Sequence, residues 1–155
     1  MSHPKISFTF DDGDTSDVAG FRNNDWNQMI LNHLKDNKIT SAFFVKGKGL
    51  DNDKGKKIIQ SWNDEGHIIC NHTYTHRSYN SSSFVDYKTD FLKNDSLIKN
   101  FSNFTKFFRF PYLKEGETAD KIQLFRELLK ENSYRNGYVT IDASDWYING
   151  RLQKN

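Results

Sequence analysis

The chain has 155 residues, of which 35% are hydrophobic and 15% aromatic, and its mean hydropathy is −0.82. That length fits one domain with its own core, and the aromatic content favours a globular chain over a disordered one. Its 22 basic and 20 acidic side chains give a net charge of +2 without long runs of one sign, which argues against a nucleic-acid partner or an anionic membrane.

Targeting and redox signals are sparse. No apolar run approaches the roughly 20 residues of a membrane-spanning helix, and no signal-peptide pattern precedes the first strand. We therefore expect no membrane span, and a chain that either acts inside the cell or has lost a leader. Cys70 is the single cysteine, so it cannot form an internal disulfide, and we expect it to be a buried packing residue. The one basic cluster, at positions 54–57, is expected at the solvated start of a helix.

The first quarter of the chain alternates strand and helix patterns. Residues 5–10 alternate in the manner of a strand and run into an acidic cluster, after which a loop rich in Asp, Gly and Asn extends to about Asn24. Apolar residues at helical spacing predict a first helix over residues 26–37. Residues 40–45 are apolar on both faces, which predicts a second strand in the centre of a sheet.

The middle of the chain continues the alternation. A short helix is expected around Trp62, and a third strand over residues 67–70. The serines at 81–83 offer an N-cap to a longer helix with apolar positions between 84 and 101. Polar residues at 94 and 95 interrupt that apolar pattern.

The last part of the chain predicts one more helix between two strands. Residues 107–109 read as a fourth strand that ends before Pro111, since proline cannot donate to a strand ladder. Thr118 is a plausible cap for a helix over residues 122–130. An Asn-Gly turn then leads into a fifth strand at 138–142. Strands that alternate with helices in this way predict an α/β domain with a parallel sheet.

Polar residues follow four of the predicted strands. In parallel α/β domains functional groups gather at the carboxyl edge of the sheet, so we expect these side chains to lie near one another. They are Asp11 and Asp12 after the first strand, His72 and His76 after the third, Arg109 at the end of the fourth and Asp142 at the end of the fifth.

The two histidines are four residues apart, a spacing that would place both rings on one face of a helical turn. Two imidazoles held in this way commonly bind a divalent transition metal, but a catalytic site needs a third ligand, usually a carboxylate. Asp11 and Asp12 are the candidate source of that carboxylate. The sequence therefore predicts a metal site built from distant stretches of the chain.

Four ordered motifs resemble those of the polysaccharide deacetylases, carbohydrate esterase family four, whose domain is also called the NodB-homology domain. The resemblance covers nearly the whole chain, and its specificity comes from the order of the motifs rather than from any one of them. The motifs are Thr9-Phe10-Asp11-Asp12, His72-Thr73-Tyr74-Thr75-His76, Arg109-Phe110-Pro111-Tyr112 and Asp142-Ala143-Ser144-Asp145-Trp146.

Similarity to that family implies a distorted (β/α) barrel and the hydrolysis of an acetyl group on a sugar polymer. It implies that Asp12, His72 and His76 bind a divalent metal, with open positions left for water and for the acetyl carbonyl oxygen. Zinc is the expected ion, although cobalt, manganese and nickel accept the same ligands. Asp11 would be the general base that takes a proton from the attacking water.

The resemblance implies further roles around that centre. Arg109 would pair with Asp11, and the backbone N–H of Tyr112 would stabilise the negative charge that develops on the carbonyl oxygen. Either Asp142 or Asp145 would be a supporting carboxylate, and the residues leave that choice open. Trp146, with Tyr147, would form a wall of the substrate groove.

The family's fifth motif, which supplies a general-acid histidine, has no counterpart here. The histidines are His3, His33, His67, His72 and His76, so nothing after residue 76 can fill that role. We expect a single domain over residues 1–155 that lacks the final strands of the barrel. His67 is expected to be structural, and His3 and His33 are assigned no role.

Three functions remain open from the sequence. The first is a metal-dependent deacetylase of a sugar polymer, and the second is a metal hydrolase of a non-peptide C–N bond in a small molecule. The third is a carbohydrate-binding remnant that keeps the metal site without turnover. The resemblance points to a secreted or cell-envelope protein if a leader has been removed, and otherwise to a cytoplasmic one. The oligomeric state and the particular acetylated substrate leave no trace in the residues.

Overall fold

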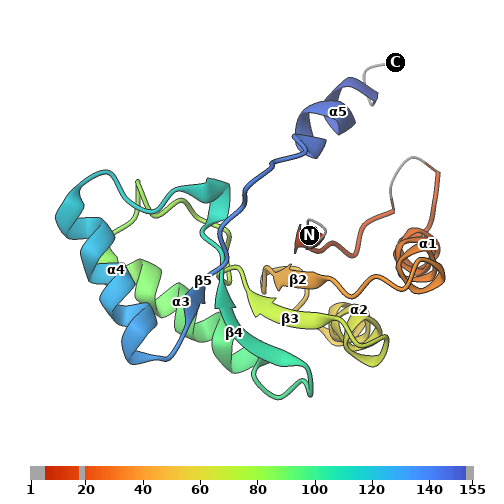
Figure 1. Cartoon of the computed structure of the whole chain (residues 1–155), viewed down its shortest axis with the longest axis horizontal. Coiled ribbons are helices and arrows are strands. Elements are labelled where there is room, and N and C mark those ends of the chain that lie inside the picture. The colour runs from red at the N-terminus through yellow and green to blue at the C-terminus, as the bar shows by residue number, and fades with distance from the viewer. Residues whose placement is uncertain (1–5, 18–19, 153–155) are drawn as a thin grey trace, which may run out of the picture.

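The computed structural model describes residues 6–17 and 20–152, which form five strands and five α-helices (Figure 1). His3 and the start of the first predicted strand, at residue 5, lie outside the described residues. The strands are β1 (Thr9–Asp12), β2 (Ala42–Val45), β3 (Ile68–Asn71), β4 (Phe104–Phe108) and β5 (Arg135–Asn136). The helices are α1 (Asn23–Asp36), α2 (Asp53–Asp64), α3 (Phe84–Ile98), α4 (Ala119–Glu131) and α5 (Asp145–Leu152).

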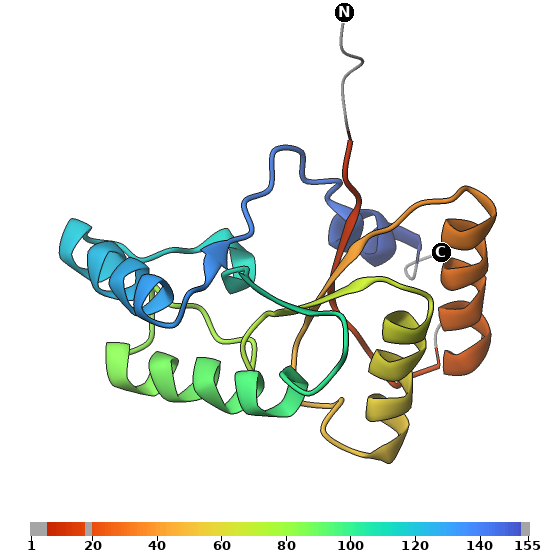
Figure 2. The ribbon, with the colours of Figure 1, turned by 60° about the horizontal axis from the view of Figure 1, so that its bottom comes forward.

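The sheet is parallel throughout and runs in chain order from β1 to β5. In Figure 2 helix α4 lies at the left of the strands, α3 lies below them, and α2 and α1 lie at the right. Over the described residues β1 and β5 form the two edges, and β2 lies inside the sheet, as its apolar pattern predicted. The expected α/β fold with parallel strands is confirmed.

Two apolar clusters fix the helices on the sheet. One joins α1 and α2 to β2 and β3 through aliphatic residues, Phe43 and Trp62. The other, between α3, α4 and β4, is mostly aromatic and is centred on Phe125, whose ring contacts five other aromatic rings within 5.7 Å: Tyr79, Tyr87, Phe91, Phe108 and Phe110. Such burial is the main favourable term in the stability of a domain of this size.

Helix caps follow the sequence signals. The side chains of Ser83 and Thr118 accept hydrogen bonds from the third residue of α3 and of α4, as predicted. The polar pair at 94 and 95 does not interrupt α3, contrary to the pattern. Asn94 is buried because its amide donates to the backbone oxygen of Val45 at 2.7 Å and to Oδ1 of Asn71 at 2.9 Å. These two hydrogen bonds satisfy the amide nitrogen of Asn94, whereas its buried Oδ1 has no hydrogen-bond partner among the described residues.

The prediction of a fifth strand over residues 138–142 was wrong. The strand is β5, two residues long, and it pairs with Phe107 and Phe108 of β4. Beyond Phe108 the segment that continues β4 forms a 3₁₀ turn at Pro111–Leu113. The residues after Asn136 therefore have no neighbouring strand in the described part of the chain to pair with. Ile141, in the middle of the predicted strand, is 87% exposed.

None of the described helices is both long and apolar enough to cross a membrane.

Candidate functional site

Three polar stretches meet at the carboxyl ends of the strands. Asp11 and Asp12 are the last residues of β1, His72 follows β3 directly, and Arg109 follows β4 directly. Asp12 has a positive φ of 72°, a conformation that non-glycine residues adopt at some cost in energy. Because the strands are parallel, their carboxyl ends lie at the same edge of the sheet, and residues that are far apart in sequence meet there.

Asp12, His72 and His76 form a compact group of possible metal ligands. One donor atom from each lies within 4.8 Å of the others. Asp12 Oδ1 is 3.2 Å from His76 Nε2 and 3.8 Å from His72 Nε2. These separations are close to the roughly 3.3 Å expected between ligand atoms that bind one tetrahedral zinc ion at about 2.0 Å.

The orientation of the His72 ring is fixed by a hydrogen bond at its Nδ1 atom. Its Nδ1 lies 2.8 Å from the backbone oxygen of Arg109, and because a carbonyl oxygen only accepts, Nδ1 must carry the proton. The Nε2 lone pair is therefore free and faces the carboxylates. Burial lowers the pKa of His72 to about 4, against the attraction of Asp12. The ring is thus neutral at neutral pH, which is the form that binds metals.

The residues between His72 and His76 form a loop and not the helical turn that their spacing predicted. Thr73 and His76 both have positive φ values, 65° and 60°. Thr73 bridges the loop because its hydroxyl oxygen accepts from the backbone N–H of His76 at 3.1 Å. The two imidazole rings still face one another, with centroids 4.9 Å apart. Burial, the largest cause, also lowers the pKa of His76.

These observations fit a divalent transition metal. Asp12 Oδ1 is buried and makes no hydrogen bond within the described part of the chain, which is costly for a carboxylate oxygen unless something else satisfies it. Two neutral imidazoles and one carboxylate are also a donor set that zinc and its neighbours accept.

Asp11 lies beside this group and is engaged differently. Its Oδ1 accepts a hydrogen bond from Nη1 of Arg109 at 2.5 Å, while its Oδ2 is 3.8 Å from His72 Nε2. Burial raises the pKa of Asp11, and the Arg109 guanidinium opposes that rise. The charge of Asp145 adds a smaller upward contribution to the same pKa, so Asp145 lies within electrostatic reach of Asp11.

Arg109 is held by contacts that the sequence did not reveal. Its Nε donates to the backbone oxygen of Gly137 at 2.9 Å, and its Nη1 donates to the hydroxyl oxygen of Thr9 at 2.8 Å. Its guanidinium carbon lies 3.9 Å from the ring centroid of Phe44. A Cβ at position 137 would lie 2.6 Å from the Phe44 ring, so only glycine fits there. Because a backbone carbonyl has no sequence pattern, no signal could have identified Gly137.

Tyr112 flanks the histidines. Its backbone has a φ of 58°, and its ring meets the His76 ring edge-on at a centroid distance of 4.6 Å. The side chain is 63% exposed. The role of its backbone N–H as a donor to a developing oxyanion stays a prediction.

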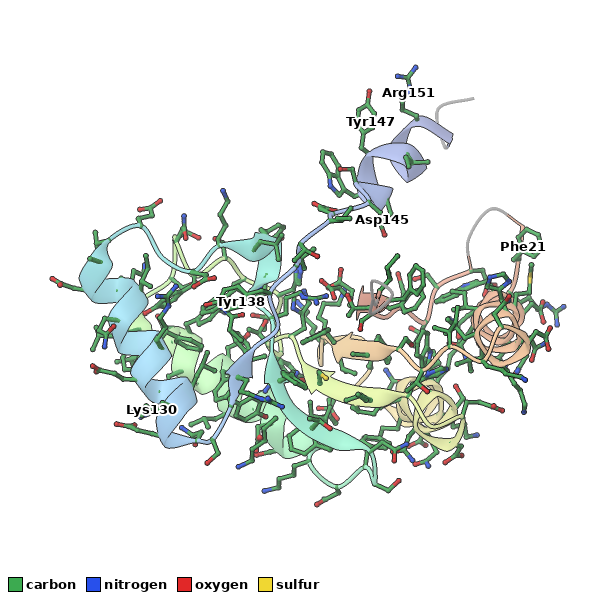
Figure 3. All side chains as sticks on the ribbon, viewed as in Figure 1. Phe21, Lys130, Tyr138, Asp145, Tyr147 and Arg151 are labelled. Carbon is green, nitrogen blue, oxygen red and sulfur yellow. The ribbon has the colours of Figure 1, made fainter. Side chains whose placement is uncertain are left out.

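The fourth motif does not join this group in the way that the sequence predicted. Asp142 lies six residues past β5, in an exposed segment, and its Oδ1 accepts from the backbone N–H of Ser144. Asp145 begins α5, from which Tyr147 projects away from the sheet (Figure 3). Trp146 is 71% exposed, and the aromatic ring that it meets is its neighbour Tyr147. The prediction that Asp142 closes a strand at the sheet edge was therefore wrong.

Two other predictions concern buried residues near the sheet. Cys70 is fully buried, and that burial raises the pKa of its thiol to about 12, as suits a packing residue. His67 is also buried, and its Nδ1 accepts from the backbone N–H of Ser41 at 3.2 Å, which agrees with a structural role.

A sequence model described as polysaccharide deacetylase matches residues 1–133 of the chain. A peptidoglycan-N-acetylmuramic acid deacetylase of Bacillus subtilis is 29% identical over 153 residues, which cover 96% of this chain and 51% of that protein. A peptidoglycan-N-acetylglucosamine deacetylase of Bacillus cereus is 27% identical over 143 residues, which cover 92% of this chain and 46% of that protein. The chain thus spans about half the length of the curated relatives that it matches.

The fold has solved counterparts. The crystal structure of a polysaccharide deacetylase from Bacillus cereus superposes with a TM-score of 0.72 at 25% sequence identity. The match covers 93% of this chain and 64% of that one. The parallel sheet is therefore shared with a solved polysaccharide deacetylase over nearly the whole length of this chain.

Proposed function

Because the chain belongs to the polysaccharide deacetylase family, we propose that it removes acetyl groups from a polymer of N-acetylated amino sugars. The observation that carries this proposal is the convergence of Asp12, His72 and His76 within 4.8 Å, with the Asp11–Arg109 pair beside them. A protein that only needed these residues for packing would have no reason to leave the buried Oδ1 of Asp12 without a hydrogen bond from any described residue.

The proposed substrate is a 2-acetamido sugar in a polymer such as peptidoglycan or chitin. The two relatives from Bacillus are named for N-acetylmuramic acid and N-acetylglucosamine, and both sugars carry the same acetamido group. The site has an exposed flank at Tyr112, which leaves room for a chain that extends beyond one sugar ring.

The metal is proposed to be zinc, held by Asp12 and by the Nε2 atoms of His72 and His76. Cobalt, nickel and manganese accept the same donors. When bound, such an ion polarises the acetyl carbonyl group and makes a water molecule more acidic.

Asp11 is proposed as the general base. One of its oxygens is occupied by Arg109, so the other oxygen is the one that faces the ligand group and can take a proton from water. A base is most effective when its pKa approaches the working pH, and burial moves the pKa of Asp11 in that direction. Arg109 keeps the carboxyl oriented and ionised. The proton on Asp11 is then available to the departing amine nitrogen, which balances the hydrolysis.

Other residues are proposed to act on the substrate. The backbone N–H of Tyr112 would donate to the carbonyl oxygen as negative charge develops on it. Asp145 is the better supporting carboxylate of the fourth motif because its charge acts on the pKa of Asp11, whereas Asp142 is not among the charges that do. Trp146 and Tyr147 would contact a sugar ring that extends from the site, since sugar faces pack on aromatic rings.

The decisive experiment replaces Asp11 with Asn and measures acetate release from chitooligosaccharides and from peptidoglycan fragments. We expect the wild type to release acetate when loaded with zinc, and the variant to lose about 100- to 10,000-fold in kcat/KM, as loss of a general base does. Zinc binding should persist in Asp11→Asn because Asp11 is not a ligand. Asp36→Asn, an exposed carboxylate at the end of α1, is the matched control and should behave as the wild type.

Zinc binding by the wild type without acetate release from either substrate would refute the deacetylase and favour a carbohydrate-binding role. Full activity in Asp11→Asn would refute the assignment of the base alone.

A further inference from the structure

Asp90 of α3 is a buried carboxylate that no step of the proposed reaction uses. It is 7% exposed. Its Oδ2 accepts from the backbone N–H groups of Tyr74 and Thr75, at 3.1 and 2.9 Å, and its Oδ1 accepts from the hydroxyl of Thr75 at 2.9 Å. All three donors belong to the loop that carries His76, so Asp90 holds this loop against α3.

The loop needs these contacts because of its conformation. Thr73 is β-branched and has a φ of 65°, and His76 has a φ of 60°. Left-handed φ values at such residues store strain and persist only where surrounding contacts determine them. Without those contacts the chain would relax, and the ring of His76 would leave its place 3.2 Å from Asp12.

The carbonyl side of the same loop is held by the segment after β2. The backbone N–H groups of Gly47 and Lys48 donate to the backbone oxygens of Thr73 and Tyr74, at 3.1 and 2.6 Å. The Tyr74 residue is therefore fixed from both sides, through its oxygen by Lys48 and through its nitrogen by Asp90. Position 47 must be glycine, since a Cβ there would lie 2.5 Å from Tyr74 and from Asn94.

We infer that Asp90 is a positioning residue of the metal site, which holds the backbone of Tyr74 and Thr75 so that His76 is placed to bind the metal together with Asp12 and His72. This inference rests on the proposed function only in that it assumes the metal site. Partners that hold metal ligands from behind are typically worth about 10- to 100-fold in metal affinity. Asp90 is one step further out, because it acts on the backbone next to a ligand, but it makes three hydrogen bonds at once.

The experiment measures the zinc dissociation constant of the full chain by competition with a chromophoric chelator at pH 7. Asp90→Ala removes both acceptor oxygens and with them all three hydrogen bonds, and we expect zinc affinity to fall by about 10- to 100-fold. Asp90→Asn keeps the geometry, because the amide oxygen can accept from both N–H groups and its NH₂ can donate to the Thr75 hydroxyl. We expect this conservative variant to restore affinity to within about fivefold of the wild type, since only the charge assistance is lost.

Asp86→Ala is the matched control. Asp86 is an exposed carboxylate one turn earlier on α3, bonded to Ser83 at the helix N-terminus and not to the loop. Its loss weakens the helix cap without touching residues 73–76. We expect it to lower the thermal midpoint while the zinc dissociation constant stays unchanged.

A second readout separates positioning from general destabilisation. The visible absorption spectrum of the cobalt-loaded protein reports ligand number and geometry, and we expect Asp90→Ala to change its intensity and band positions while Asp86→Ala does not. If Asp90→Ala fails to fold, Thr75→Val decides, because it keeps the side-chain shape and removes one of the three hydrogen bonds to Asp90, together with an exposed one from Nε of Arg77. It should weaken zinc binding by about three- to tenfold.

The inference is overturned if folded Asp90→Ala binds zinc within twofold of the wild type with an unchanged cobalt spectrum, or if Thr75→Val does so when Asp90→Ala is unfolded. Failure of the wild type itself to bind zinc would refute the metal site and, with it, this inference.

Discussion

The loop from His72 to His76 and the segment from 138 to 152 both carry motifs of the family, yet their surroundings differ. His72 is 2% exposed, and the loop is hydrogen-bonded to α3 and to the segment after β2. Trp146 is 71% exposed, and α5 stands apart from the sheet (Figures 1 and 3). Residue types alone therefore do not make a site. A motif becomes a site where neighbouring elements hold its backbone in one conformation.

The largest effect on zinc affinity should come from replacing a metal ligand. His76→Ala removes one of three metal-binding atoms. We expect zinc affinity to fall by more than about 100-fold, which is the upper bound for a residue that only supports a metal ligand. His33→Ala, an exposed histidine in the last turn of α1, is the matched control and should leave affinity unchanged. Chelator competition on both variants measures the difference. Equal affinities would mean that the loop is not part of a metal site.

Arg109→Met tests the ion pair between Arg109, which is buried, and Asp11. Kcat/KM should fall by about 100-fold or more, because Asp11 loses the group that orients it. Arg109 also holds the pKa of Asp11 down against burial, so its removal should raise that pKa further. The acid limb of the pH–rate profile should then move to higher pH, since more of the base is protonated at a given pH.

The control for that variant is Arg126→Met, which breaks the exposed ion pair with Glu115. Surface pairs contribute little, so its kinetics and pH profile should match those of the wild type. An unmoved acid limb in Arg109→Met would show that Arg109 does not act on Asp11.

The buried histidines should make the metal-free protein sensitive to acid. The folded-state pKa of His72 is lowered from 6.5 to about 4, so the unfolded chain takes up a proton at a higher pH than the folded one. Stability is then fully present above about pH 6.5 and is lost as the pH falls toward 4, by about 3 kcal/mol for this residue. Urea unfolding between pH 4 and 7 measures it. In His72→Gln this part of the pH dependence should disappear. If it persisted, His72 would not be the group that takes up the proton on unfolding.

The smallest effect is expected in the exposed segment. Trp146→Ala should change the free energy of unfolding by no more than about 0.5 kcal/mol and leave zinc affinity unchanged, because the side chain is largely in water. Trp62→Ala is the buried counterpart at 3% exposure and should cost about 3 to 5 kcal/mol. The KM of Trp146→Ala for a chitooligosaccharide then tests whether α5 contacts substrate. An unchanged KM would show that Trp146 does not contact the substrate.

Much of the fold could be predicted because its signals are local. The apolar spacing of α1 and α2, the caps at Ser83 and Thr118, and the apolar β2 each depend on residues close in sequence. The prediction failed for β5 because strand length depends on the partner strand, and β4 ends at Phe108. It failed for the histidine loop because a four-residue spacing is compatible with a helix and with a loop that has left-handed residues.

The sequence by itself determined the order of the elements and the chemical kinds of donor: two imidazoles, two carboxylates and one guanidinium. Only the tertiary structure decided that Gly137 and Thr9 hold Arg109, and that Asp90 holds the loop of His76. The reason is physical. Periodicity and caps reflect neighbours within a few residues, whereas these contacts join positions from 15 to 100 apart, which come together only when the sheet pairs and α3 packs beneath it.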